Sequence, residues 1–79
     1  MFERLASKLD SISCKMILGE TLKKRTWQIE QRRPDLSPRE VEEMAKQEML
    51  TSMRSEALDA TSFHAVREWS KRFLSNMGI

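Results

Sequence analysis

The sequence is poor in the residues that build disulfide frameworks, metal centres and phosphate-binding loops. Its 79 residues include one cysteine, one histidine, two glycines, two prolines and no tyrosine. A lone Cys14 excludes an internal disulfide framework, and no Cys/His cluster has the spacing of a structural zinc site. Two glycines far apart in the chain exclude a glycine-rich loop that holds phosphate. The fold therefore has to be stabilised by apolar packing.

Long apolar runs are also missing. The longest one near the N-terminus is Met16-Ile17-Leu18, which is far shorter than the apolar stretch of a signal peptide or of a membrane-spanning helix. Glu3 and Asp10 argue against a transit peptide, because such peptides are poor in acidic residues. The sequence predicts a cytoplasmic protein that does not bind membranes.

Most of what is present favours helix. Met, Leu, Glu, Lys, Arg and Gln are common, and β-branched residues nowhere alternate with polar ones over the length of a strand. Residues 1–79 are expected to form a single helical domain. The predicted fold class is all-α, a small bundle of three to four helices with short connections. Because so short a chain buries little surface, assembly as a homodimer is a further expectation.

A first apolar stripe predicts an amphipathic helix from Phe2 to about Leu18. Alternating spacings of three and four residues place the members of this stripe on one face of the helix. The members are Phe2, Leu5, Leu9, Ile12 and Met16. Such a near-heptad pattern suits a shallow contact with another helix, either inside a bundle or across a dimer.

A second apolar stripe begins in a different phase. Its members are Leu18, Leu22 and Ile29. This stripe predicts a second helix from Glu20 to about Gln31, which has to end by Arg33 because Pro34 disfavours the helical conformation in the residue before it. Gly19 either separates the two helices or bends one continuous helix, and the sequence leaves both alternatives open.

The clearest helix start lies at Pro38. Ser37 is a capping residue, Pro38 suits the first helical position, and Glu40 completes a capping box. Leu36 and Val41 lie on either side of the cap and predict a hydrophobic staple. Four separate features thus agree that a helix begins here.

This helix is expected to run from Pro38 to about Leu58. Its apolar residues lie on more than one side, which predicts contacts with two neighbours or with a second copy. A turn rich in capping residues, 59–62, precedes the last helix, which ends before Gly78. The last helix carries one broad apolar stripe. The members of that stripe are Phe63, Val66, Trp69, Phe73, Leu74 and Met77.

We expect no enzymatic activity, no small-molecule substrate, no metal and no cofactor. A catalytic pair made from Cys14 and His64 would need a third group and an enclosed pocket. Glu40, Glu42 and Glu43 suit the first turn of a helix, where the helix dipole favours negative charge. Cys14 is expected in or near the interior, and His64 on the solvated surface.

Methionine and arginine supply the candidate binding groups. Met is soft and adaptable and recurs on surfaces that accept varied helical ligands, although it also fills cores. The main prediction is a binding or regulatory protein that acts through helix-to-helix contact with a protein partner or with itself. The expected apolar anchors are Met44, Met49, Met53, Trp69 and Phe73. The expected charged residues are Arg25, Arg32 and Arg33.

The alternative prediction is a nucleic-acid-binding module. Residues 1–39 hold nine Lys and Arg against five Asp and Glu, whereas residues 40–79 hold five against seven. The basic residues of segment 23–33 flank Trp27, and cations beside an aromatic side chain are typical of nucleic-acid binding. The same segment would equally form an ordinary solvated helix with a partly buried Trp27.

Part of the chain resembles the LuxR-type helix-turn-helix domain. Segment 36–42, LSPREVE, looks like the opening of that domain, and segment 76–79, NMGI, is similar to its ending. Val66 falls near the valine of its recognition helix. The resemblance implies a four-helix DNA-binding module that uses residues around Ser62 to Lys71. The nucleic-acid alternative thus has two candidate surfaces, the basic segment 23–33 and the last helix. The sequence departs from the family where no glycine follows the first helix of this region, and where Ser55-Glu56 replaces an apolar pair.

Overall fold

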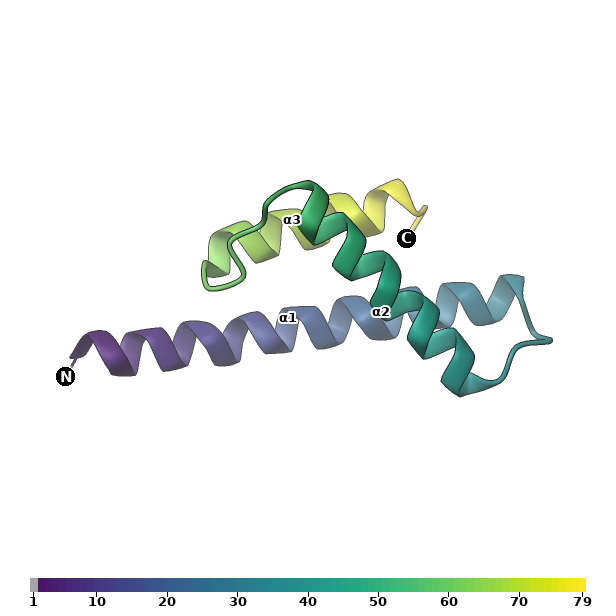
Figure 1. Ribbon diagram of the computed structural model, residues 1–79, viewed down its shortest axis with the longest axis horizontal. Coiled ribbons are helices and arrows are strands. Elements are labelled where there is room, and N and C mark those ends of the chain that lie inside the picture. The colour runs from purple at the N-terminus through teal and green to yellow at the C-terminus, as the bar shows by residue number, and fades with distance from the viewer. Residues whose placement is uncertain (1) are drawn as a thin grey trace.

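The chain forms three helices in the computed structural model, which describes the backbone of residues 2–79 and the side chains of residues 12–79. α1 spans Phe2–Arg32, α2 spans Pro38–Ser55 and α3 spans Phe63–Asn76. Both shorter helices pack against α1 (Figure 1). Residues 2–79 contain no strand. The all-α prediction is confirmed, with three helices.

α1 runs along the longest dimension of the molecule, which measures 50 Å. α2 crosses α1 over its C-terminal half, and α3 lies along one side of α1 (Figure 1). The N-terminal part of α1, purple in Figure 1, extends past both of the other helices. Only part of α1 is therefore covered by the rest of the chain.

α1 is one continuous helix through Gly19. A glycine in the middle of a helix lowers helix stability but does not by itself end the helix. The helix ends at Arg32, ahead of Pro34, as the restriction on the residue before a proline predicts. The two helices expected before Pro34 are therefore a single helix with two apolar faces.

Both shorter helices begin at a serine cap. The Ser37 hydroxyl accepts a hydrogen bond from the backbone N–H of Glu40 at 3.3 Å, and Ser62 caps α3 in the same way, also at 3.3 Å. Leu36 packs against the core cluster that contains Val41, as the predicted staple requires. The predicted start of α2 at Pro38 is confirmed.

α2 ends at Ser55, three residues before the predicted end. Ala57 adopts a left-handed conformation with φ 49°, which turns the chain away from the helix axis. The Ala57 N–H donates to the Arg54 carbonyl at 3.1 Å, and the Leu58 N–H donates to the Met53 carbonyl at 3.0 Å. These two bonds form a Schellman motif. This end of α2 could not be predicted from the sequence, because alanine is a strong helix former.

The connection from α2 to α3 contains the predicted turn at 59–62. The Asp59 carboxylate accepts hydrogen bonds from the Thr61 N–H at 3.0 Å and from the Thr61 hydroxyl at 2.6 Å. These bonds, the hydroxyl bond foremost, lower the pKa of Asp59 because they stabilise its charged form. Ser62 follows directly and caps α3.

Two apolar clusters form the core. The first consists of Ile29, Val41 and Ala45. The second is built around Met49, Trp69 and Phe73. The Trp69 and Phe73 rings stack with their centroids 5.1 Å apart, and the Trp69 indole N–H donates to the Ser52 hydroxyl at 2.9 Å. The core therefore joins all three helices, and its one indole has a hydrogen-bond partner.

A buried polar chain also links the three helices. Arg25 of α1, which is 8 % exposed, forms an ion pair with Glu48 of α2 at 2.5 Å. Arg25 also donates to the Gln28 side-chain carbonyl, and the Gln28 amide donates to the backbone carbonyl of Met77 at the end of α3. A buried cation is stable only when it is paired and hydrogen-bonded, and these contacts satisfy that requirement.

Candidate interaction surface

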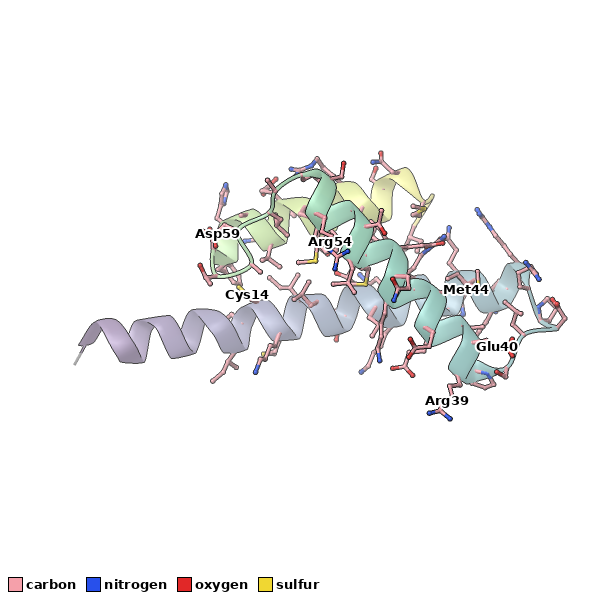
Figure 2. All side chains as sticks on the ribbon, in the orientation of Figure 1. Cys14, Arg39, Glu40, Met44, Arg54 and Asp59 are labelled. Carbon is pink, nitrogen blue, oxygen red and sulfur yellow. The ribbon has the colours of Figure 1, made fainter. Side chains whose placement is uncertain are left out.

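α1 has an inner face that packs against α2 and α3. Its buried members are Cys14, Thr21, Arg25, Gln28 and Ile29. Thr21 hydrogen-bonds Ser70 of α3, and Cys14 points from α1 toward the connection between α2 and α3 (Figure 2). The core and the polar chain thus use the same side of α1.

The outer face of α1, defined here by Ile12, Met16 and Trp27, lies on the opposite side. The exposed fractions of these three residues are 55 %, 68 % and 59 %. At 3.6 residues per turn they lie within an arc of roughly 60°, on the side away from Thr21. The backbone register places positions 5 and 9 in the same arc and position 2 at its edge. The described members of the first apolar stripe, Ile12 and Met16, are therefore turned away from the bundle.

The second apolar stripe of α1, and not the first, packs into the core. Ile29 is buried, and Leu18 and Leu22 pack partly buried against the two core clusters. The change of phase near Gly19 was the sequence signal for this arrangement. It marks two faces of one helix, not two successive helices.

An open apolar groove of about 330 Å³ lies between α1 and α2. Its lining residues are Leu18, Gly19, Leu22, Lys46, Met49, Leu50 and Met53. Gly19 lies about one helical turn from Met16, so the groove borders the outer face beside Met16. A side chain at position 19 would meet nothing within 4 Å. Apolar surface thus continues from the outer face of α1 into the groove.

Several predicted anchor residues lie in the core. Trp69, Phe73 and Met49 are buried, because they form the second core cluster. A partner cannot contact Trp69 without unpacking the core, whereas Met49 also lines the open groove between α1 and α2. Met53 is half-buried at the groove, and Met44 is exposed on α2 (Figure 2).

The three predicted arginines also differ in their surroundings. Arg25 is buried in its ion pair with Glu48 and is unavailable to a partner. Arg33 forms an exposed ion pair with Asp35 at 3.4 Å, and its hydrogen bond lowers the pKa of Asp35. Arg32 is exposed at the end of α1. The structure does not bring these three residues together into one charged site.

The remaining cations of segment 23–33 are dispersed. Lys23, Lys24 and Arg32 are exposed, but steps of about 100° per residue point them in three directions around α1. Trp27, for which a partly buried position was one alternative, is exposed on the side of Lys23. A nucleic-acid backbone could contact only a few of these cations at the same time. The electrostatic attraction between the protein and the phosphates would therefore be weak.

The other titratable candidates lie where the sequence predicts. Cys14 is buried and His64 is exposed. Among residues 12–79, no three His, Cys, Asp or Glu side chains are grouped in a way that could hold a metal ion. Among residues 2–79, no helix has the length and apolar character needed to cross a membrane.

No known protein family, curated protein or solved structure matches this chain. The structure also differs from the four-helix module that the resemblance of segment 36–42 implies. Residues 36–79 form only two helices, joined by residues 56–62. That connection is longer than the turn of three or four residues typical of a helix-turn-helix.

Proposed function

We propose that this protein is a non-enzymatic binding or regulatory protein that acts through helix-to-helix contact, with the outer face of α1 as its contact surface. The observation that carries the proposal is the exposure of Ile12, Met16 and Trp27 on one face of a helix whose opposite face packs against the core. Large apolar side chains grouped on a free surface are typical of protein interaction sites.

A second copy of the chain is the partner that best fits this face. The first apolar stripe has the 3-4 spacing of helices that pair along a narrow seam, and the same seam is present on every copy. A chain of this length buries a smaller fraction of its surface than a larger domain does, so a dimer gains apolar burial. The homodimer predicted from the sequence would therefore form through α1.

The two most reactive side chains have places that fit a non-enzymatic role. Cys14 is enclosed in the core against the α2–α3 connection, where a thiol is inert. His64 is exposed in the first turn of α3. A buried thiol and a solvated imidazole do not suit the activated pair that nucleophilic catalysis requires.

Sedimentation equilibrium from low to high micromolar concentration tests the proposal. We expect the unaltered chain to form dimers, and Met16→Lys or Ile12→Lys to shift it toward monomer by placing a charge in the seam. Both side chains are exposed in the single chain, so circular dichroism should show unchanged helix content.

Met44→Lys is the matched control, because Met44 is also an exposed methionine but lies on α2. This variant should associate like the unaltered chain. A monomer at every concentration, or equal loss of association in the Met44 and Met16 variants, would contradict the proposal. A titration of random duplex DNA against salt tests the nucleic-acid alternative, which tight and steeply salt-dependent binding would favour.

A further inference from the structure

We infer that two copies pair through their outer faces with the α1 helices parallel and in register. This inference rests on the proposed function, since it names the geometry of the same contact. It follows from three features of α1: the spacing of its outer positions, the charges beside them, and the placement of α2 and α3. Each feature is independent of the other two.

The outer positions of α1 follow the two seam positions of a heptad, conventionally a and d. Positions 2, 9 and 16 correspond to a, and positions 5, 12 and 19 correspond to d. Of the described seam positions, Ile12 and Met16 are exposed in the single chain, and Gly19 is half-buried at the groove beside α2. The next a position is Lys23, and two lysines facing each other at the centre of a seam repel. The apolar seam therefore ends after about two heptads.

The charges beside the seam distinguish parallel from antiparallel pairing. Lys15 lies at position g and Glu20 at position e, and both are exposed. In a parallel pair, the g residue of one helix faces the e residue of the next heptad in the other helix. Lys15 would thus face the partner's Glu20, and the twofold symmetry would form this pair twice. Within residues 12–79, neither residue takes part in another ion pair.

Antiparallel pairing would bring like charges together. In that arrangement g positions face g positions, so the lysines at positions 8 and 15 would lie opposite each other. Opposed charges of the same sign disfavour a pairing geometry. The sequence of charges along α1 thus favours the parallel arrangement for a pair of identical chains.

The fold leaves room for this pair. α3 lies on the side of Thr21 and Gln28, and α2 packs on the side of Leu22 and Ile29. Open grooves separate α2 from Gly19 and from Trp27. In a parallel pair, the two sets of shorter helices would lie at the same end and on the far sides of the central α1 helices (Figure 1). Each chain keeps its own core, so association needs no unpacking.

A charge swap tests the facing of Lys15 and Glu20. Lys15→Glu and Glu20→Lys each replace two attractive pairs with two repulsive ones, so each should weaken the dimer by up to about tenfold. The double variant restores opposite charges and should recover most of the affinity. Lys24→Glu is the matched control, because Lys24 is exposed on α1 but lies away from the seam. This control should leave the affinity unchanged.

A cysteine at position 16 tests the register. In the parallel pair, Met16→Cys should form a disulfide with its own copy under mild oxidation, because identical seam positions are adjacent. In an antiparallel pair the two cysteines would lie about 17 Å apart along the axis, at 1.5 Å per residue, and could not join. The unaltered chain controls for Cys14, which is buried and should stay reduced.

The outcomes separate this inference from the proposed function. A dimer with a position-16 disulfide and recovery in the double charge variant supports both. A dimer without that disulfide, or without recovery, overturns the parallel arrangement and leaves the proposed function standing. A disulfide that forms only when Met16→Cys and Leu5→Cys chains are mixed shows antiparallel pairing. A monomer at all concentrations overturns both.

Discussion

Ala57 occupies a backbone conformation that costs an alanine free energy. At φ 49° its Cβ crowds the following carbonyl, whereas glycine adopts this region freely. Gly78 holds the equivalent position after α3, where φ is 79° and the same two Schellman bonds form, from Gly78 to Ser75 and from Ile79 to Leu74. Two helices of one chain thus end in the same motif with different residues.

Ala57→Gly should therefore stabilise the fold. We expect the free energy of unfolding to rise by about 1 kcal/mol, because the strain of the left-handed conformation is removed. Urea denaturation at one fixed protein concentration measures the change. Ala60→Gly is the control: Ala60 is exposed in the same connection without a positive φ, so this variant should gain nothing. Equal effects of the two variants would contradict the assignment of strain to Ala57.

Substituting Arg25 and substituting Glu48 should lower the free energy of unfolding by different amounts. Arg25 is buried, whereas the Glu48 side chain is 35 % exposed. Glu48→Ala leaves a buried cation without its counter-charge and should lower the free energy of unfolding by about 3 kcal/mol. Arg25→Met leaves a carboxylate that can turn to water and should cost about 1–2 kcal/mol.

The double variant, Arg25→Met with Glu48→Leu, completes this comparison. It replaces both charges with apolar groups and should be more stable than Glu48→Ala alone, because no unpaired charge remains. Urea denaturation of all four chains gives the coupling between the two residues. A larger loss for Arg25→Met than for Glu48→Ala would contradict the view that the cost lies in burying the guanidinium.

At the scale of the element, α1 carries a glycine that neither breaks nor bends it into two helices. Gly19 has open space around it, so Gly19→Ala should raise the free energy of unfolding by up to about 1 kcal/mol through helix propensity. Circular dichroism with urea denaturation, at concentrations where the chain is monomeric, measures this. Gly78→Ala, at φ 79°, should lower the stability instead. Destabilisation by Gly19→Ala would show that position 19 is closely packed.

The ends of the elements were predicted with unequal success. The starts of α2 and α3 followed from Ser37 and Ser62, since capping is a contact between residues three apart in sequence. The end of α1 followed from the restriction that Pro34 imposes. The end of α2 did not, because Ala57 takes its conformation against its own propensity.

At the scale of the whole molecule, the N-terminal part of α1 extends past α2 and α3 (Figure 1). If pairing covers this part, its amide hydrogen exchange should slow as protein concentration rises, since exchange there then requires dissociation. Amides near Gln28, inside the core, should be insensitive to concentration over the same range. Exchange in the N-terminal part that is independent of concentration would contradict pairing through this region.

The candidate interaction surface could be predicted only in part from the sequence. The stripe that contains Ile12 and Met16 suited a helix contact either inside a bundle or across a dimer, and the predicted anchors included Trp69 and Phe73, which the core buries. Periodicity shows that a face is apolar and cannot show which apolar face meets solvent. The position of Arg25 could not be predicted either. A basic residue on a helix is usually exposed to solvent, whereas Arg25 is buried in an ion pair with Glu48.

The sequence by itself determined the all-α class, the starts of the shorter two helices and the presence of two apolar stripes before Pro34, because propensity, capping and 3.6-residue periodicity act between near neighbours. Only the tertiary structure decided which face of α1 turns inward, which methionines are buried and where Arg25 finds its counter-charge. Those outcomes depend on where α2 and α3 dock, which is set by contacts between residues far apart in the chain.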